Sequence, residues 1–248
     1  MDWILIIGVI AVGFAAGFIN TIAGGGSALT LPFLIFLGLP ANIANGTNRI
    51  GILMQNVVAT SSFKKHQKIN IKHATILAIP SVVGAIIGAQ FASVLDENIM
   101  EKAIGIALIL MLGLIVYKPE KWIQESIVFE KPGFLQIIYM FLVGLYGGFI
   151  QIGAGFFMLA TLVIGVGYDL VRANAAKVYV MAIYTFFALG VFVLNNQIDY
   201  TLGLVLAVGN MIGGWIGAKA ALKLGTKFIR YFLIITILVS AIKLFIGF

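Results

Sequence analysis

Residues 20–27 are Asn20-Thr21-Ile22-Ala23-Gly24-Gly25-Gly26-Ser27, and they interrupt an otherwise apolar stretch. Glycine loses more conformational freedom in a helix than any other residue, so three glycines in succession predict a helix break. A similar interruption, Gln151-Ile152-Gly153-Ala154-Gly155, lies 131 residues further along. Backbone opened inside a membrane must find partners or line a cavity, so the breaks predict a binding site. The alternative is that the glycines only allow close packing of helices.

The composition indicates which solvent surrounds the fold. Hydrophobic residues make up 61% of the 248 residues and charged residues 10%, with a mean hydropathy of +1.10. Soluble domains average about 45–50% apolar and about 25% charged residues. We therefore predict an all-α polytopic membrane protein in contact with the lipid bilayer. The net charge of +7 comes mainly from short segments between apolar runs, so nucleic-acid binding is not expected.

Ten apolar runs can be marked along the chain. Most are near the ~20 residues that cross a bilayer, which predicts 8–10 membrane segments. Residues 27–39 and 154–167 are short for a full crossing, and each directly follows one of the two interruptions. The runs are 3–23, 27–39, 41–62, 73–95, 98–117, 133–151, 154–167, 170–194, 200–222 and 226–247.

The two halves of the chain match each other. Gly13 and Gly17 align with Gly144 and Gly148 at an offset of 131, and later segments align at an offset of 129. This predicts a first repeat over residues 1–117 and a second over 133–248, joined by a linker over 118–132.

The distribution of Lys and Arg predicts the orientation. These residues are concentrated in loop 63–72, in the linker and in turn 219–230, and basic loops favour the cytoplasmic side. Both termini are then outside, and the second repeat is inverted relative to the first. The expected location is the cytoplasmic (inner) cell membrane.

Arg49 and Lys177 are basic residues set well inside predicted spans, at nearly matching positions of the two halves. A charge at the membrane centre is costly, and the apolar runs contain no acidic residue at comparable depth. An anionic solute that binds and leaves would stabilise both cations; alternatively, each could extend to a membrane surface. The predicted substrate-binding residues are Asn20, Thr21, Gly24, Gly25, Gly26, Ser27, Asn45, Thr47, Asn48, Arg49, Gln151, Gly153, Gly155, Asn174 and Lys177.

The sequence resembles the sulfite exporter TauE/SafE family. The resemblance rests on the glycine-rich stretch 13–27, on Leu31-Pro32, on Ala44-Asn45-Gly46-Thr47-Asn48 and on the small residues of 84–89. It implies a permease of organosulfur or related oxyanions such as sulfite or sulfonates. The second half departs from the pattern, since Ala175-Ala176 stands where the first half has Gly46-Thr47.

These observations predict a secondary transporter of a small anion that works by alternating access. Inverted repeats with interrupted helices are typical of such carriers. The alternatives are a channel-like anion pore and a non-transporting membrane scaffold. Neither an enzyme activity nor a cofactor or metal is expected. The sequence leaves open the coupling ion (proton or sodium), the substrate, the direction of transport and the oligomeric state.

Overall fold

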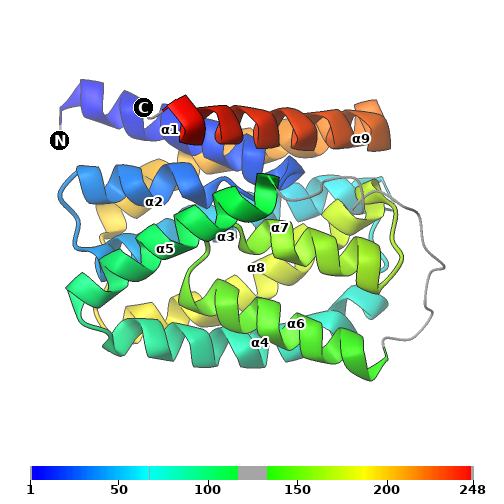
Figure 1. Ribbon diagram of the computed structural model, residues 1–248, viewed down its shortest axis with the longest axis horizontal. Coiled ribbons are helices and arrows are strands. Elements are labelled where there is room, and N and C mark those ends of the chain that lie inside the picture. The colour runs from blue at the N-terminus through cyan, green and yellow to red at the C-terminus, as the bar shows by residue number, and fades with distance from the viewer. Residues whose placement is uncertain (1, 67, 117–132, 247–248) are drawn as a thin grey trace.

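The computed structural model describes residues 2–66, 68–116 and 133–246, and the helices dominate this part of the chain (Figure 1). The predicted linker, 118–132, lies outside the described residues. The helices are α1 Trp3–Ile22, α2 Ser27–Phe36, α3 Ala41–Lys65, α4 Ile71–Val94, α5 Glu97–Val116, α6 Phe134–Phe149, α7 Ala154–Ala160, the π-helix η2 Thr161–Gly165, α8 Leu170–Leu194 and α9 Tyr200–Ile246.

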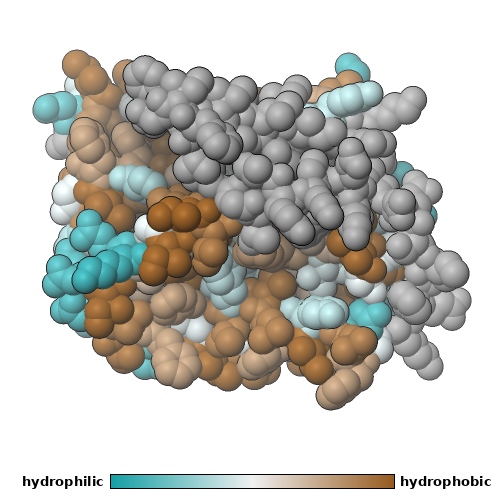
Figure 2. Space-filling view, viewed as in Figure 1, coloured by the Kyte–Doolittle hydropathy of each residue, from teal (hydrophilic) through white to brown (hydrophobic). Residues whose placement is uncertain are grey.

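The surface is that of a membrane protein. Large apolar side chains such as Ile4, Phe36 and Phe91 are well exposed, as they would be towards lipid. Figure 2 shows brown, hydrophobic residues over most of the coloured face, with the strongest teal at its left edge. Among the described residues, four helical stretches are long and apolar enough to cross a membrane: Trp3–Ile22, Ile71–Val94, Leu170–Leu194 and Tyr200–Gly225. The all-α membrane class is thus confirmed.

Both predicted helix breaks are present. Helix α1 ends at Ile22, Gly24 has a φ of 86°, and α2 begins at Ser27. In the second half, α6 ends before Ile150, Gly153 has a φ of 72°, and α7 follows. A positive φ costs glycine little but strains other residues, which explains why Gly24 and Gly153 are glycines. Helix α9 kinks at Gly225, where φ is 69°, and the described part of the predicted segment 226–247, up to Ile246, lies in α9 after this kink.

The helices pack in two corresponding pairs. Helix α1 lies along α9, and α6 lies along α4 (Figure 1). Small residues allow this approach: a Cβ atom added to Gly13 would lie 2.6 Å from the carbonyl oxygen of Leu206, and one added to Gly144 would meet that of Ser81. The first α-helix of each half therefore packs on the fourth α-helix of the other half, with backbones nearly in contact.

These contacts also correct the sequence alignment in one region. Gly84 and Gly88 on α4 face α6 as Gly209 and Gly213 on α9 face α1. The corresponding residues in this pair of helices are therefore 125 apart (209 minus 84), not the 129 of the sequence alignment, a difference of about one helical turn. The inverted orientation of the halves across a membrane remains a prediction.

Candidate functional site

The two broken segments touch each other. A Cβ atom added to Gly155 would lie 2.6 Å from the Cα of Gly24, and one added to Gly24 would overlap the backbone of Gly155 and Phe156. No real side chain fits at such separations, so the contact requires glycine on both sides. The break of the first half therefore meets the break of the second half inside the protein.

Lys177 binds the carboxyl end of α1, directly before the first break. Its side chain is fully buried on α8, and its Nζ donates to the carbonyl oxygens of Asn20, at 3.0 Å, and Thr21, at 2.9 Å. A third hydrogen bond, at 2.6 Å, goes to the Oδ1 of Asn174 one turn earlier on the same helix. An ammonium group has three donors, so all three are used.

Arg49 binds the carboxyl end of α6, directly before the second break, in the same way. It is fully buried on α3, and its guanidinium donates to the carbonyl oxygens of Gly147, at 3.0 Å, and Gly148, at 2.5 Å. Asn45, one turn earlier, donates through Nδ2 to the carbonyl oxygen of Phe149 at 2.8 Å. The guanidinium also lies 4.5 Å from the centre of the Phe192 ring, within the range of a cation–π contact.

The alternative in which these cations extend to the membrane surfaces is wrong. Each cation instead lies at the carboxyl end of a helix, where the helix dipole is negative. Each such end carries about half an elementary charge, so two cations and two ends leave roughly one positive charge. The described residues contain a single ion pair, Arg172 with Asp169, and its arginine is largely exposed. No carboxylate in the described part of the chain therefore neutralises Lys177 or Arg49.

Several buried polar atoms near the breaks lack a hydrogen-bond partner among the described residues. Most of them are donors, or hydroxyl groups that can donate. Burying such groups without a partner is unfavourable, so they indicate an occupant that accepts hydrogen bonds, a solute or water. They are Thr21 Oγ1, Asn48 Nδ2, Arg49 Nε, Asn174 Nδ2 and Tyr184 OH; the acceptor Gln151 Oε1 also lacks a partner among the described residues.

All the residues predicted from sequence to bind substrate are buried, but they do not form a single cluster. Gly25, Gly26 and Ser27 lie in or directly after the first break, and the Asn48 Oδ1 accepts a hydrogen bond from Thr30 at 2.6 Å. Thr47 serves another purpose: its Oγ1 accepts a hydrogen bond from the backbone N–H of Asp199, at 2.9 Å. Thr47 therefore holds the turn between α8 and α9 and is removed from the site.

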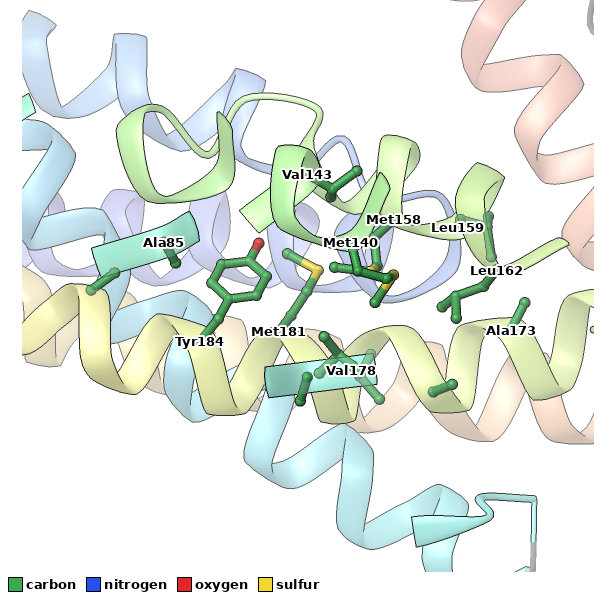
Figure 3. Close-up of a cluster of buried hydrophobic side chains, with 14 of the residues drawn as sticks. Ala85, Met140, Val143, Met158, Leu159, Leu162, Ala173, Val178, Met181 and Tyr184 are labelled. Atoms are coloured by element: carbon green, nitrogen blue, oxygen red, sulfur yellow. The ribbon is translucent and has the colours of Figure 1, made fainter. Parts of the chain in front are cut away.

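Tyr184 was missed by the sequence analysis. It lies seven residues after Lys177 on α8, which is two helical turns, so both side chains share one face. The side chain is fully buried, and a Cβ atom added to Gly147 would lie 2.7 Å from its hydroxyl oxygen. Figure 3 shows its ring beside Met181, with the hydroxyl directed away from α8. The sequence signal that could have predicted this residue is a tyrosine two helical turns after a lysine in an apolar run.

An apolar cavity of about 590 Å³ lies elsewhere, against α5, α6 and α7. Its lining includes Leu142, Val143, Phe157 and Ile164 but none of the residues predicted to bind substrate. Such a lining does not stabilise an anion. The polar chemistry of the protein is therefore at the breaks and not in this cavity.

Comparison with known proteins gives the family of this chain. A family model described as "Sulfite exporter TauE/SafE" matches residues 9–244. The chain belongs to the sulfite exporter TauE/SafE family. The protein is accordingly a membrane transporter. Most of its described buried polar side chains lie on α1, α3 and α8.

Relatives in this family are similar over nearly their whole length. A "Probable membrane transporter protein ORF9" from Sinorhizobium is 28% identical, covering 93% of this chain and 88% of the relative. "Probable membrane transporter protein YfcA" from Escherichia coli is 29% identical, covering 97% and 90%. "Probable membrane transporter protein YunE" from Bacillus subtilis is 24% identical, covering 88% and 89%. No solved structure matches the chain.

Proposed function

We propose that the protein is a secondary transporter of a small anion, of the class of sulfite, sulfonates and related organosulfur oxyanions. The observation that carries the proposal is the pair of fully buried cations, Lys177 and Arg49, without a carboxylate partner in the described part of the chain. A charge at the centre of a membrane helix costs about 2.5–3.5 kcal/mol on insertion scales. The helix ends offset part of this cost, and an anion would offset the remainder.

The uncompensated donors favour an oxyanion over a simple halide. The Nδ2 groups of Asn48 and Asn174 and the hydroxyl of Tyr184 are buried without hydrogen-bond partners among the described residues. A group with several acceptor oxygens can engage several such donors at once, and hydrogen bonds to a charged acceptor are about twice as strong as neutral ones. The name of the family supports the same class of solute.

The contact between the breaks suggests how the solute would cross. In carriers built from inverted repeats, the site lies between the halves, and one half moves against the other. Gly24 and Gly155 bring the two halves together at the breaks, and residues at this contact would be exposed alternately to each side. We place the protein in the cell membrane with both termini outside, as the distribution of basic loops predicts.

A reconstitution experiment tests the proposal. Purified protein in liposomes should take up labelled sulfite or a sulfonate with saturable kinetics, and K177A should lose most of this uptake. The matched control is K219A, which removes an exposed lysine that lies over the Trp215 ring on α9. Uptake by K177A equal to that of wild type would remove the proposed countercharge. Flux that never saturates would indicate a channel-like pore instead.

A further inference from the structure

The three oxygens around Lys177 form a site of a kind that usually suits a metal cation. Two are carbonyl oxygens at the end of an interrupted helix, and the third is an amide oxygen, all within 3.0 Å of Nζ. In transporters with discontinuous helices, such carbonyl ends coordinate the coupling cation. Carbonyl and amide oxygens are also typical ligands of hard cations. Here the position is taken by the ammonium group of the protein itself.

The second break repeats this arrangement with a different side chain. Gly147 and Gly148 direct carbonyl oxygens at the guanidinium of Arg49, and the Oδ1 of Asn45 lies 3.4 Å from the same group. In both cases the cation comes from a helix of the opposite half, and an asparagine about one turn before it completes the shell. Two occurrences with the same logic make coincidental packing a poor explanation.

We propose that Lys177 and Arg49 are tethered cations that take the place of free metal cations at the ends of α1 and α6. The protein therefore needs no bound Na⁺ or K⁺ to neutralise its broken helices. That Lys177 and Arg49 occupy the cation positions at the ends of α1 and α6 is inferred from the hydrogen-bond geometry alone. Its consequence, that anion uptake requires neither Na⁺ nor K⁺, rests on the proposed function.

Charge and geometry both prevent a metal ion from joining the tethered cation. The three donors of Lys177 already use the inward-facing oxygens, and a second positive charge among them would be repelled. No cluster of three or more acidic, histidine or cysteine side chains in the described residues offers a metal another site. Removing the ammonium group should therefore expose a vacant site that a small cation can occupy.

The salt dependence of thermal unfolding tests this directly. Wild type, K177A and the control K219A would be unfolded in NaCl, KCl and choline chloride at equal ionic strength. Chloride is common to all three salts, so only the cation varies. For wild type and for K219A, we expect the unfolding midpoint of each protein to be the same in all three salts. K177A should unfold at a lower temperature in choline chloride and regain part of the loss in NaCl or KCl, because a cation bound to the native state stabilises it.

Two results would overturn the proposal. One is a K177A midpoint that is equal in the three salts, and the other is a wild-type midpoint that rises specifically with Na⁺ or K⁺. Should K177A not be recovered folded, the wild-type comparison still decides. Replacing Na⁺ by choline on both sides of wild-type liposomes should leave anion uptake unchanged, and a several-fold loss would refute the transport consequence.

The two proposals can fail separately. The unfolding experiment contains no oxyanion, so its failure leaves the anion transporter in place. Conversely, absence of oxyanion uptake with an intact salt response in K177A would remove the proposed substrate but keep the tethered cations.

Discussion

The Nζ of Lys177 donates a hydrogen bond of 2.9 Å to the carbonyl oxygen of Thr21, which lies 156 residues earlier in the chain. A cation from the second half thus stabilises the end of a helix from the first half. Arg49 does the reverse, since it comes from the first half and binds the end of α6. The two halves are therefore joined by exchanged cations at the place where each has an open backbone.

This exchange makes a specific prediction for Arg49. R49K keeps the charge, but its ammonium nitrogen sits on a side chain one bond shorter than that of arginine. From α3 it should lose at least one of the contacts to Gly147 and Gly148, which Nη1 and Nη2 of the guanidinium make separately. A carbonyl left without a partner costs about 1–3 kcal/mol, so the unfolding midpoint in detergent should fall. R49Q should fall further, because it also removes the charge from the helix end.

The control for this pair is R172K. Arg172 is exposed and pairs with Asp169 at 3.4 Å, and surface pairs contribute about 0–1 kcal/mol. Its midpoint should remain close to that of wild type. An R49K midpoint equal to that of R172K would show that the contacts of Arg49 do not hold the second break.

The contact between the breaks makes a second prediction. G24A adds a methyl group that overlaps the backbone of Gly155, at a residue whose φ is 86°. Both the steric conflict and the backbone strain oppose folding, and strain of this kind alone costs about 1–3 kcal/mol. We expect a marked loss of folded protein, measured by size-exclusion chromatography in detergent.

Gly38 offers a control that separates the two causes. Its φ is 92°, but a Cβ atom there would meet no atom of the described residues within 4 Å. G38A therefore carries the strain without the steric conflict, and it should lower the yield less than G24A. Equal losses in the two variants would mean that the breaks do not need to touch.

The corrected alignment can be tested with the glycine row of α9. Gly213 is a contact glycine at either offset, whereas Gly209 is one only at 125 and Gly217 only at 129. A Cβ atom at Gly209 would overlap the carbonyl oxygen of Ile10, whereas one at Gly217 would lie 3.1 Å from that of Phe18. G209A should therefore separate α1 from α9 and lower the unfolding midpoint, because overpacking costs about 1–3 kcal/mol. G217A should have the smaller effect, and the opposite order would restore the offset of 129.

Much of the fold could be predicted from the sequence, for reasons that are local. Three successive glycines in an apolar run weaken a helix wherever they stand, so the break at Gly24–Gly26 required no knowledge of neighbours. The alignment of α4 with α9 was harder, because Gly209, Gly213 and Gly217 recur every four residues. Gly84 and Gly88 match glycines at either offset, and only the contacts with α6 and α1 decide.

The candidate site could be predicted only in part. The positions of Lys177 and Arg49 in apolar runs allowed either burial or extension to a membrane surface, and only the structure shows that both are buried. Their partners could not be predicted either. Which carbonyl oxygens they reach depends on how α3 and α8 cross between the two breaks, and this is determined by packing of the whole bundle. Thr47 was assigned to the site because it is polar and close in sequence to Arg49, yet it points to the turn before α9.

Replacing Tyr184 by phenylalanine should separate an effect on anion uptake from an effect on stability. Its hydroxyl is buried without a partner among the described residues, so Y184F removes a group that contributes no protein hydrogen bond there. The ring and its packing are retained, and the unfolding midpoint should be unchanged or slightly raised. If the hydroxyl donates to the bound anion, the KM for oxyanion uptake should rise about 10–150-fold, the equivalent of one hydrogen bond to a charged acceptor of about 1.5–3 kcal/mol. The matched control is Y139F, since Tyr139 is exposed on α6. A Y184F protein with wild-type uptake would place the anion away from this hydroxyl, whereas one that unfolds at a clearly lower temperature would show that the hydroxyl has a structural partner such as a buried water.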